Sequence, residues 1–278
     1  MNDERGMMKN VACLCALFLA ALCPAGEEGN AGKWKPPENP KDDAHWYPEM
    51  PMNKEAHPSL PNGNFEEAAP ETPGRLPSPI GWAHVDDYMI FWKQDSDPAH
   101  GKCIVIDTDI SEADAKKRQA AVREAGEKGT PVPPAPKPSR GAGYGAIAGT
   151  YGVSFYSERI ACKPKQPYKI TFDYKGPSGG AKVWVRGWGE FNGEERRRWE
   201  TIVNCRTKGD GWRHFEQAFH PTRRPTGRDT ETFVDISCLR VMLYAYWPPG
   251  QYAFDNIKIE EISDDEFKRL KAIPADAK

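Results

Sequence analysis

Short runs of β-branched, aromatic and aliphatic residues recur along the chain from residue 62 onward, and turns rich in Gly, Pro and Asp separate them. Hydrophobic and polar positions alternate within many of these runs, which is typical of strands in an all-β sandwich. We therefore expect an all-β fold, a two-sheet β-sandwich, over residues 62–262. The expected strands cover residues 64–68, 82–93, 102–109, 152–162, 168–175, 181–190, 199–205, 212–219, 238–247 and 251–262.

Two segments depart from this alternation. Residues 111–150 open with Ser111 and, three residues later, Asp114, which is a capping-box pattern at the start of an alanine-rich and charged stretch. This pattern predicts a helix, and the proline-rich residues after it predict an extended return, so we interpret 111–150 as an insert in a loop. In residues 263–278, Ser263 precedes acidic and then basic residues, an order that favours a short C-terminal helix.

Alternation also assigns the faces of the strands, because successive side chains of a strand point to opposite sides of its sheet. Val183 and Val185 form a core-facing set in one strand, and Leu239, Val241, Leu243 and Ala245 form one in another. The opposite sides of these two strands mix aromatic residues with arginine. The candidate ligand-binding residues on them are Trp184, Arg186, Trp188, Arg240, Tyr244 and Tyr246.

A surface of this composition suits a glycan. The apolar C–H faces of sugar rings stack on aromatic planes, while the hydroxyl groups need polar partners around the rim. The alternative is that the insert or the N-terminal segment covers these aromatic residues, which would then form a minor core.

Asp255 is an exception in the last expected strand. We place it in the same register as Ala253, Ile257 and Ile259, which we expect on the inner face. A buried carboxylate must be protonated, paired or bound to a cation, because burying a lone charge is costly. No lysine or arginine is obviously reserved for Asp255, so a Ca²⁺ ion with oxygen ligands is the expected solution.

Several motifs, taken in order, resemble the galactose-binding-like β-jelly-roll carbohydrate-binding modules that are often appended to secreted glycoside hydrolases. They are "NGNFEE", "PIGW", "PYKITFDYKG", a "GW" before a strand and "YAFDNIKIEEI", and they span most of residues 60–262. The resemblance implies a two-sheet jelly roll in which a structural Ca²⁺ joins the first and last strands. Glu66 and Asp255 match the metal positions, and Trp184, Trp188, Tyr244 and Tyr246 match a ligand site on the concave sheet.

The N-terminal segment is expected to direct export. An apolar run at residues 11–22 follows Lys9 and precedes small residues at Cys23 and Ala25, so residues 1–25 are expected to be a signal peptide. A lipoprotein anchored at Cys23 is the alternative. Residues 26–61 are charged and proline-rich, which is typical of a linker or arm. We therefore expect a periplasmic, cell-surface or secreted protein with no membrane span.

Four cysteines follow the expected signal peptide: Cys103, Cys162, Cys205 and Cys238. An even number of cysteines in an exported chain suggests two disulfides, with Cys205–Cys238 as our preferred pair. Four buried free thiols are the alternative. The net charge of −2 excludes a generally basic, nucleic-acid-binding character.

Signals for catalysis are weak. Glu190, Glu194 and Glu195 lie near the candidate face, but acids beside the run Arg196–Arg198 are more typical of solvated ion pairs than of a glycosidase site. Two loops are expected to hold six arginines, which are either solvated charge or a rim for an anionic polysaccharide: Arg196, Arg197, Arg198, Arg223, Arg224 and Arg228. The sequence thus favours a non-catalytic glycan-binding protein. The alternatives are a structural or protein-interaction jelly roll of the cell envelope and a small glycan-active hydrolase or lyase.

Overall fold

The computed structural model describes residues 55–140, 145–206, 210–223 and 232–272. The expected signal peptide at residues 1–25, the alternative anchor at Cys23 and most of the expected arm at 26–61 lie outside these residues. No helix within the described ranges is long and apolar enough to cross a membrane.

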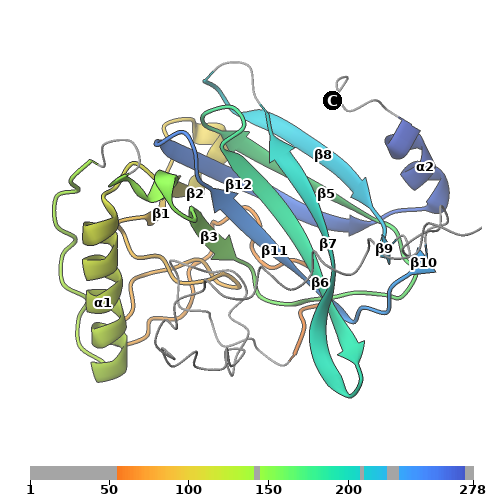
Figure 1. The fold of residues 1–278 in the computed structure, drawn as a ribbon, viewed down its shortest axis with the longest axis horizontal. Helices are drawn as coiled ribbons and strands as arrows, with labels where there is room; N and C mark the ends of the chain where they lie inside the picture. Colours follow the sequence, from red (N-terminus) through yellow and green to blue (C-terminus); the bar gives the residue numbers. More distant parts are fainter. Residues whose placement is uncertain (1–54, 141–144, 207–209, 224–231, 273–278) are drawn as a thin grey trace, which may run out of the picture. The chain divides into compact units, whose positions relative to one another are not determined.

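Two antiparallel β-sheets form a sandwich (Figure 1), which confirms the predicted fold class. One sheet contains β1 (Ile90–Gln94), β2 (Lys102–Asp107), β12 (Gln251–Glu261), β5 (Tyr168–Lys175) and β8 (Arg213–Phe219), in that spatial order. The other contains β3 (Val153–Tyr156), β11 (Cys238–Ala245), β6 (Ala181–Phe191) and β7 (Glu194–Cys205), with β4 (Ile160–Ala161) also paired to β11. We call them the β12 sheet and the β6 sheet. A separate ribbon pairs β9 (Thr222–Arg223) with β10 (Thr232–Phe233).

The core lies between the two sheets. Val183 and Val185 of β6 are fully buried there, as are Leu239, Val241, Leu243 and Ala245 of β11, so the predicted inner sets are confirmed. Burying each large apolar side chain stabilises the fold by about 1.5–3 kcal/mol. This shared core fixes which side of each β6-sheet strand faces outward.

The hairpin between β6 and β7 corrects one expectation. We expected strands at 181–190 and 199–205 with Arg196–Arg198 in the loop between them, and this was wrong: β7 begins at Glu194 and contains all three arginines. The loop is only Asn192-Gly193, with φ angles of 54° and 78°. Asn-Gly favours two-residue hairpin turns because both positions need a positive φ.

The expected strand at 64–68 and the first part of that at 82–93 were also wrong. These segments form only isolated bridges, Ala68 with Pro79 and Trp82 with Ser157, and β1 begins later, at Ile90. Phe65 has a φ of 54°, which no extended strand adopts. Its ring is fully buried against Trp82, and its carbonyl accepts a hydrogen bond from Trp92 Nε1. Phe65 therefore anchors a turn in the core.

Both predicted helices are present. Helix α1 (Glu112–Lys128) is capped by Ser111, which accepts a hydrogen bond from the Asp114 amide, and α2 (Asp264–Ala272) packs near β8. Short 3₁₀ turns lie at Pro98–His100 and Ile147–Gly149. Figure 1 shows α1 beside β1 and β2 at one end of the sandwich.

Candidate functional site

The outer face of the β6 sheet gathers the six predicted ligand-binding residues. Cross-strand pairing of β11 with β6 sets Arg240 opposite Arg186, and Cys238 opposite Trp188. In the same register Met242 faces Trp184 and Tyr244 faces Lys182, while the Tyr246 amide continues the ladder to the Gly180 carbonyl. Side chains alternate along a strand, so this face contains all six predicted residues: Trp184, Arg186, Trp188, Arg240, Tyr244 and Tyr246.

These six residues differ in exposure. Arg186, Trp188 and Arg240 are buried, whereas Trp184, Tyr244 and Tyr246 are half-buried. The guanidinium of Arg186 lies 5.0 Å from the Trp184 ring centroid, and Arg240 Nε donates to the Ser157 carbonyl at 2.9 Å. The two arginines thus lie beneath the face, and an incoming ligand would meet the three aromatic residues first.

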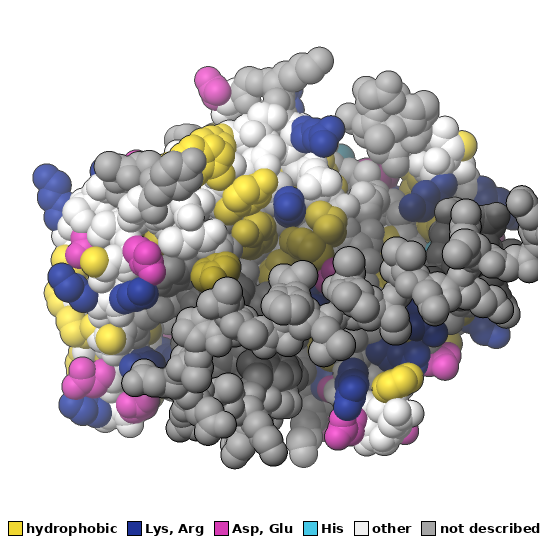
Figure 2. Space-filling view, viewed as in Figure 1, with side chains coloured by type: hydrophobic (Ala, Val, Ile, Leu, Met, Phe, Trp, Pro, Cys, Tyr) yellow, Lys and Arg dark blue, Asp and Glu magenta, His cyan; other side chains and the backbone are white. Residues whose placement is uncertain are grey.

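The accessible end of this face carries a group of aromatic side chains. The rings of Tyr244 and Tyr246 stack with centroids 5.5 Å apart, and the Tyr244 hydroxyl donates to the Tyr151 carbonyl at 2.8 Å. The Tyr151 side chain is 65% exposed. We call Tyr151, Trp184, Tyr244 and Tyr246 the aromatic platform. Figure 2 shows hydrophobic side chains gathered on this side of the molecule, with Lys or Arg among them.

Gly152 allows the loop before β3 to approach the platform. Its φ is +70°, and a Cβ there would lie 2.5 Å from the Ala245 carbonyl oxygen and 2.8 Å from the Tyr246 Cβ. Only glycine fits so close a contact at a positive φ. Gly152 therefore holds the backbone of Tyr151 against Tyr244.

The predicted ligand-binding set did not include Tyr151 or Lys182. Alternation put Lys182 on the same face as Trp184, and in the structure its Nζ lies 5.2 Å from the Tyr246 ring centroid. Tyr151 precedes its strand in a loop, so no periodic pattern could have placed it. The adjacent Tyr-Gly pair was the only sequence signal.

The insert helix does not supply a cover for the platform. The described contacts of α1 include the loop at residues 73–88, where Gly74 lies close to the Ala125 carbonyl and Arg118 donates to the Asp86 carbonyl. They also include the extended return of the insert, where Arg118 donates to the Pro133 carbonyl. The expectation that the insert closes the face thus receives no support from α1.

The predicted metal residues lie on the other sheet. Asp255 is 1% exposed, but its placement in the inner register was wrong, because Tyr252 and Phe254 are the core residues of this part of β12. The register of β12 shifts between Asp255 and Lys258, where Asn256 has a φ of 51°. This β-bulge resets the alternation, so Asp255 faces the outer side of the β12 sheet while Ile257 returns to the core.

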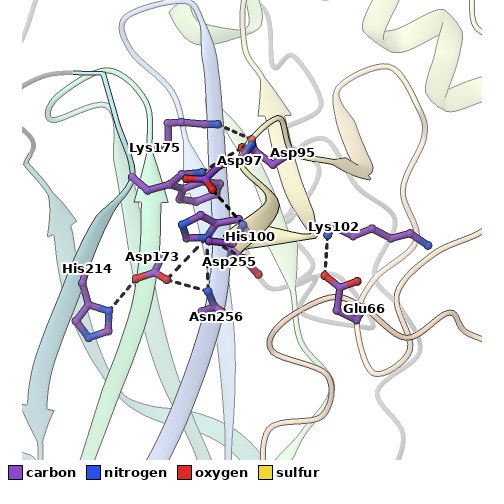
Figure 3. A network of polar contacts seen from close by, with 12 residues as sticks. Glu66, Asp95, Asp97, His100, Lys102, Asp173, Lys175, His214, Asp255 and Asn256 are labelled. Atoms are coloured by element: carbon purple, nitrogen blue, oxygen red, sulfur yellow. Dashed lines mark hydrogen bonds and ion pairs between the residues drawn. The ribbon is translucent and has the colours of Figure 1, made fainter.

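Figure 3 shows Asp255 within a network of polar contacts. Its Oδ2 lies 3.0 Å from His100 Nδ1, and the His100 ring stacks on Trp212 with centroids 3.9 Å apart. Asp173 belongs to the same network and accepts a hydrogen bond from the Asn256 amide at 2.9 Å. Burial raises the pKa of Asp255 to about 6, although hydrogen bonds from the backbone amide of Asn256 and from His100 act to lower this pKa.

Glu66 reaches the same segment from the opposite direction. Its Oε1 accepts a hydrogen bond from the Lys102 amide at 2.7 Å, and Gly101 leaves room for this carboxylate. Glu66 and Asp255 therefore both contact residues 100–102 (Figure 3). Asp255 Oδ1 is buried and has no hydrogen-bond partner in the described ranges. Those ranges contain no group of three or more His, Cys, Asp or Glu side chains placed to hold a metal ion.

Two of the three acids near the candidate face form ion pairs with arginines. Glu195 pairs with Arg159, which is buried, and Glu194 pairs with Arg196 on the hairpin. Glu190 is exposed opposite Glu195. Glycosidase chemistry needs a carboxyl group that exchanges a proton with the substrate. The geometry of Glu194 and Glu195 instead matches surface ion pairs.

The preferred disulfide Cys205–Cys238 was wrong, and the four described cysteines are buried free thiols. Cys205 pairs with Ala181 and Cys238 pairs with Trp188, at opposite ends of β6. Seven residue steps along a strand correspond to about 23 Å. A disulfide needs Cα atoms within about 7 Å of each other.

No family model matches the chain, and no curated protein matches it. Solved structures similar to it include the enzymatically active domain of bacteriophage CBA120 tailspike protein 4, at 13% identity and a TM-score of 0.37, covering 66% of this chain but only 20% of that one. A family 16 carbohydrate-binding module is similar at 12% identity and a TM-score of 0.40, covering 73% of this chain and 99% of the module. A family 11 carbohydrate-binding module from a cellulosomal cellulase of Clostridium thermocellum is similar at 15% identity and a TM-score of 0.32, covering 75% and 97%.

Proposed function

We propose that this chain is a non-catalytic glycan-binding protein that stacks sugar rings on the aromatic platform. The observation that carries the proposal is the stacked pair Tyr244 and Tyr246 on the half-exposed end of the β6 sheet. Exposed Tyr151 lies beside this pair, and Lys182 lies over Tyr246. Flat aromatic surface with polar groups at its edge is what a sugar ring requires.

The polar neighbours of the platform support the same function. Asn204 of β7 is exposed and pairs with Lys182, so an amide and an ammonium group flank the tyrosines. These groups can hydrogen-bond to sugar hydroxyls. We further propose that the sandwich is of the galactose-binding-like jelly-roll type. The order of sequence motifs and the pairing of the last strand, β12, with β2 and β5 support this assignment.

Affinity electrophoresis through a panel of neutral and acidic polysaccharides tests the binding proposal. Retardation on at least one polysaccharide is expected, and Tyr246→Ala should weaken binding by up to about tenfold, since an aromatic stacking contact is worth roughly 0.5–1.5 kcal/mol. The matched control is Phe191→Ala, which removes a 43% exposed ring at the tip of the β6–β7 hairpin. The absence of retardation on every glycan would refute the proposal, as would equal losses in both variants.

We also propose a structural Ca²⁺ held by Glu66 and Asp255. The buried oxygen Asp255 Oδ1, which has no partner in the described part of the chain, is a hard donor that suits this cation. Glu66 adds a second carboxylate beside the same backbone segment. A bound Ca²⁺ would supply the positive charge that a buried carboxylate requires and would tie the loop at residue 66 to β12.

Melting temperature provides a readout for the metal that does not depend on glycan binding. EDTA should lower it for the wild-type protein, and added Ca²⁺ should restore it. Glu66→Gln should abolish this response, whereas Glu67→Gln, at the neighbouring exposed acid, should retain it. A wild-type melting temperature that neither EDTA nor Ca²⁺ changes would eliminate the site.

A further inference from the structure

Lys182 occupies a central position on the accessible end of the β6 sheet. It is half-buried, with Tyr244 as its neighbour on β11 and Asn204 as its neighbour on β7. Trp184 lies two residues further along the same strand and therefore on the same face. The ammonium group of Lys182 is thus surrounded by the aromatic rings and amide on which the proposed sugar site depends.

No carboxylate of the described ranges forms an ion pair with Lys182. Among the described residues its Nζ contacts the Tyr246 ring, at 5.2 Å from the centroid. Glu200, a carboxylate on the neighbouring strand, instead lies 3.5 Å from Arg186. A half-buried cation attracts an anion more strongly than a fully exposed one does, because less water screens the pair.

The other basic residues that could have bound an anionic glycan are engaged elsewhere. Arg196 pairs with Glu194, and Arg197 lies 4.0 Å from Glu200. Arg198 donates to the Glu190 carbonyl and lies over the Phe191 ring, 5.0 Å from its centroid. The arginine run on β7 thus makes its contacts within its own hairpin. Two cations lie against the platform: Arg186, which contacts Trp184 and lies 3.5 Å from Glu200, and Lys182, which forms no ion pair with a described carboxylate.

We propose that the glycan bound at the aromatic platform is acidic and that Lys182 forms an ion pair with its carboxylate or sulfate group. This inference rests on the proposed function and deepens it by naming the class of sugar. Lys182 is the residue of β6 that pairs with Tyr244 of β11. The substituents of a sugar ring stacked on Tyr244 and Tyr246 would therefore lie beside Lys182. A neutral sugar there would leave the ammonium group with hydroxyl partners only.

Isothermal titration calorimetry with matched ligands tests the charge requirement. The ligands are an oligogalacturonate and its methyl ester, which differ in charge at similar size, and dextran sulfate beside dextran, which tests sulfate as the alternative anion. The acidic member of one pair should bind about tenfold more tightly than its neutral partner, as expected for a hydrogen bond to a charged group. Salt should weaken binding of the acidic ligand and leave the neutral one nearly unchanged.

Variants assign the preference to one side chain. Lys182→Gln should remove the preference for the acidic ligand and keep weak binding of the neutral one, whereas Lys182→Arg should retain the preference. The matched control is Lys93→Gln, because Lys93 is an exposed lysine that lies over an aromatic ring, Phe91, on the other sheet. Unchanged melting temperatures would show that the variants are folded.

The outcomes separate the two proposals. If acidic and neutral ligands bind equally, the inference about acidity is overturned and glycan binding stands. If the acidic preference survives in Lys182→Gln as it does in Lys93→Gln, the role of Lys182 is overturned. If no ligand binds the wild-type protein and the polysaccharide panel also fails, the proposed function itself is wrong.

Discussion

Replacing Arg118 of helix α1 with methionine should destabilise the whole sandwich, although the residue lies in a loop insert. The Arg118 side chain is buried, its Nε donates to the Asp86 carbonyl at 2.8 Å, and its Nη1 donates to the Pro133 carbonyl at 2.6 Å. It thus joins three parts of the chain: α1, the loop before β1 and the extended return of the insert. Methionine keeps the apolar stem and removes only the guanidinium group.

The expected cost follows from the groups that the substitution leaves behind. The buried Asp86 carbonyl loses its donor at a cost of about 1–3 kcal/mol, whereas Pro133 is exposed and its carbonyl can bond to water instead. The carboxylate of Asp86 is also buried and loses a nearby positive charge. Methionine also avoids the cost of burying the guanidinium group, and this gain offsets part of the loss. We therefore expect the free energy of unfolding to decrease by about 2–4 kcal/mol. For a domain of this size each kcal/mol lowers the melting temperature by roughly 2–4 °C.

The pH dependence of this loss has a defined sign. Burial raises the pKa of Asp86, while the Arg118 charge lowers it. A carboxyl group with a raised folded-state pKa binds its proton more tightly when folded, so stability decreases as the pH rises through that value. Removing Arg118 raises the pKa of Asp86 further. The penalty of the variant should therefore be smaller in acid than at neutral pH.

Urea denaturation of Arg118→Met beside Arg123→Met measures the loss. Arg123 lies on the same helix with its side chain 67% exposed, 3.9 Å from Glu127, and its replacement should stay within about 0.5 kcal/mol of the wild type. Amide hydrogen exchange would report whether α1 and the loop at Asp86 open together. Equal stability of the two variants would refute the argument that the insert is anchored through Arg118.

Two further outcomes are expected. Alkylation at pH 8, mapped by peptide mass, should leave the four described cysteines unmodified in the native protein and modify all of them after denaturation without reductant. Burial raises the pKa of Cys103 to about 12 and that of Cys162 to about 11, so reactive thiolate should appear only in strong alkali or on unfolding. A cysteine that stays unmodified after denaturation would contradict the assignment of free thiols. Gly152→Ala should lower both the melting temperature and the affinity for glycan, because the new Cβ would clash with the Ala245 carbonyl. The control Gly145→Ala should leave both unchanged, because a Cβ there has no atom within 4 Å.

Period-two alternation predicted which side of β6 and β11 faces the core, because aliphatic residues such as Val183 and Val241 occupy every second position and are buried there. It could not predict which outward residues are covered, since burial of Arg186 depends on segments distant in sequence. Alternation failed at Asp255 because a one-residue bulge at Asn256 reverses the faces, and single-sequence patterns do not mark bulges. The disulfide failed because pairing depends on the register of three strands, which no cysteine spacing reveals.

The outer face of the β12 sheet is a less suitable glycan site than the platform, although it is also rich in polar groups. Its charged side chains already pair with one another: Lys175 with Asp95, His214 with Asp173 and His100 with Asp255. The Trp212 ring there stacks on His100, and the Lys175 Nζ lies 4.8 Å from its centroid. A ligand on that face would have to break ion pairs and uncover a ring before making its own contacts. At the platform it meets tyrosine rings and Lys182, which no carboxylate of the described residues neutralises, so binding there breaks no ion pair of Lys182 with a described residue.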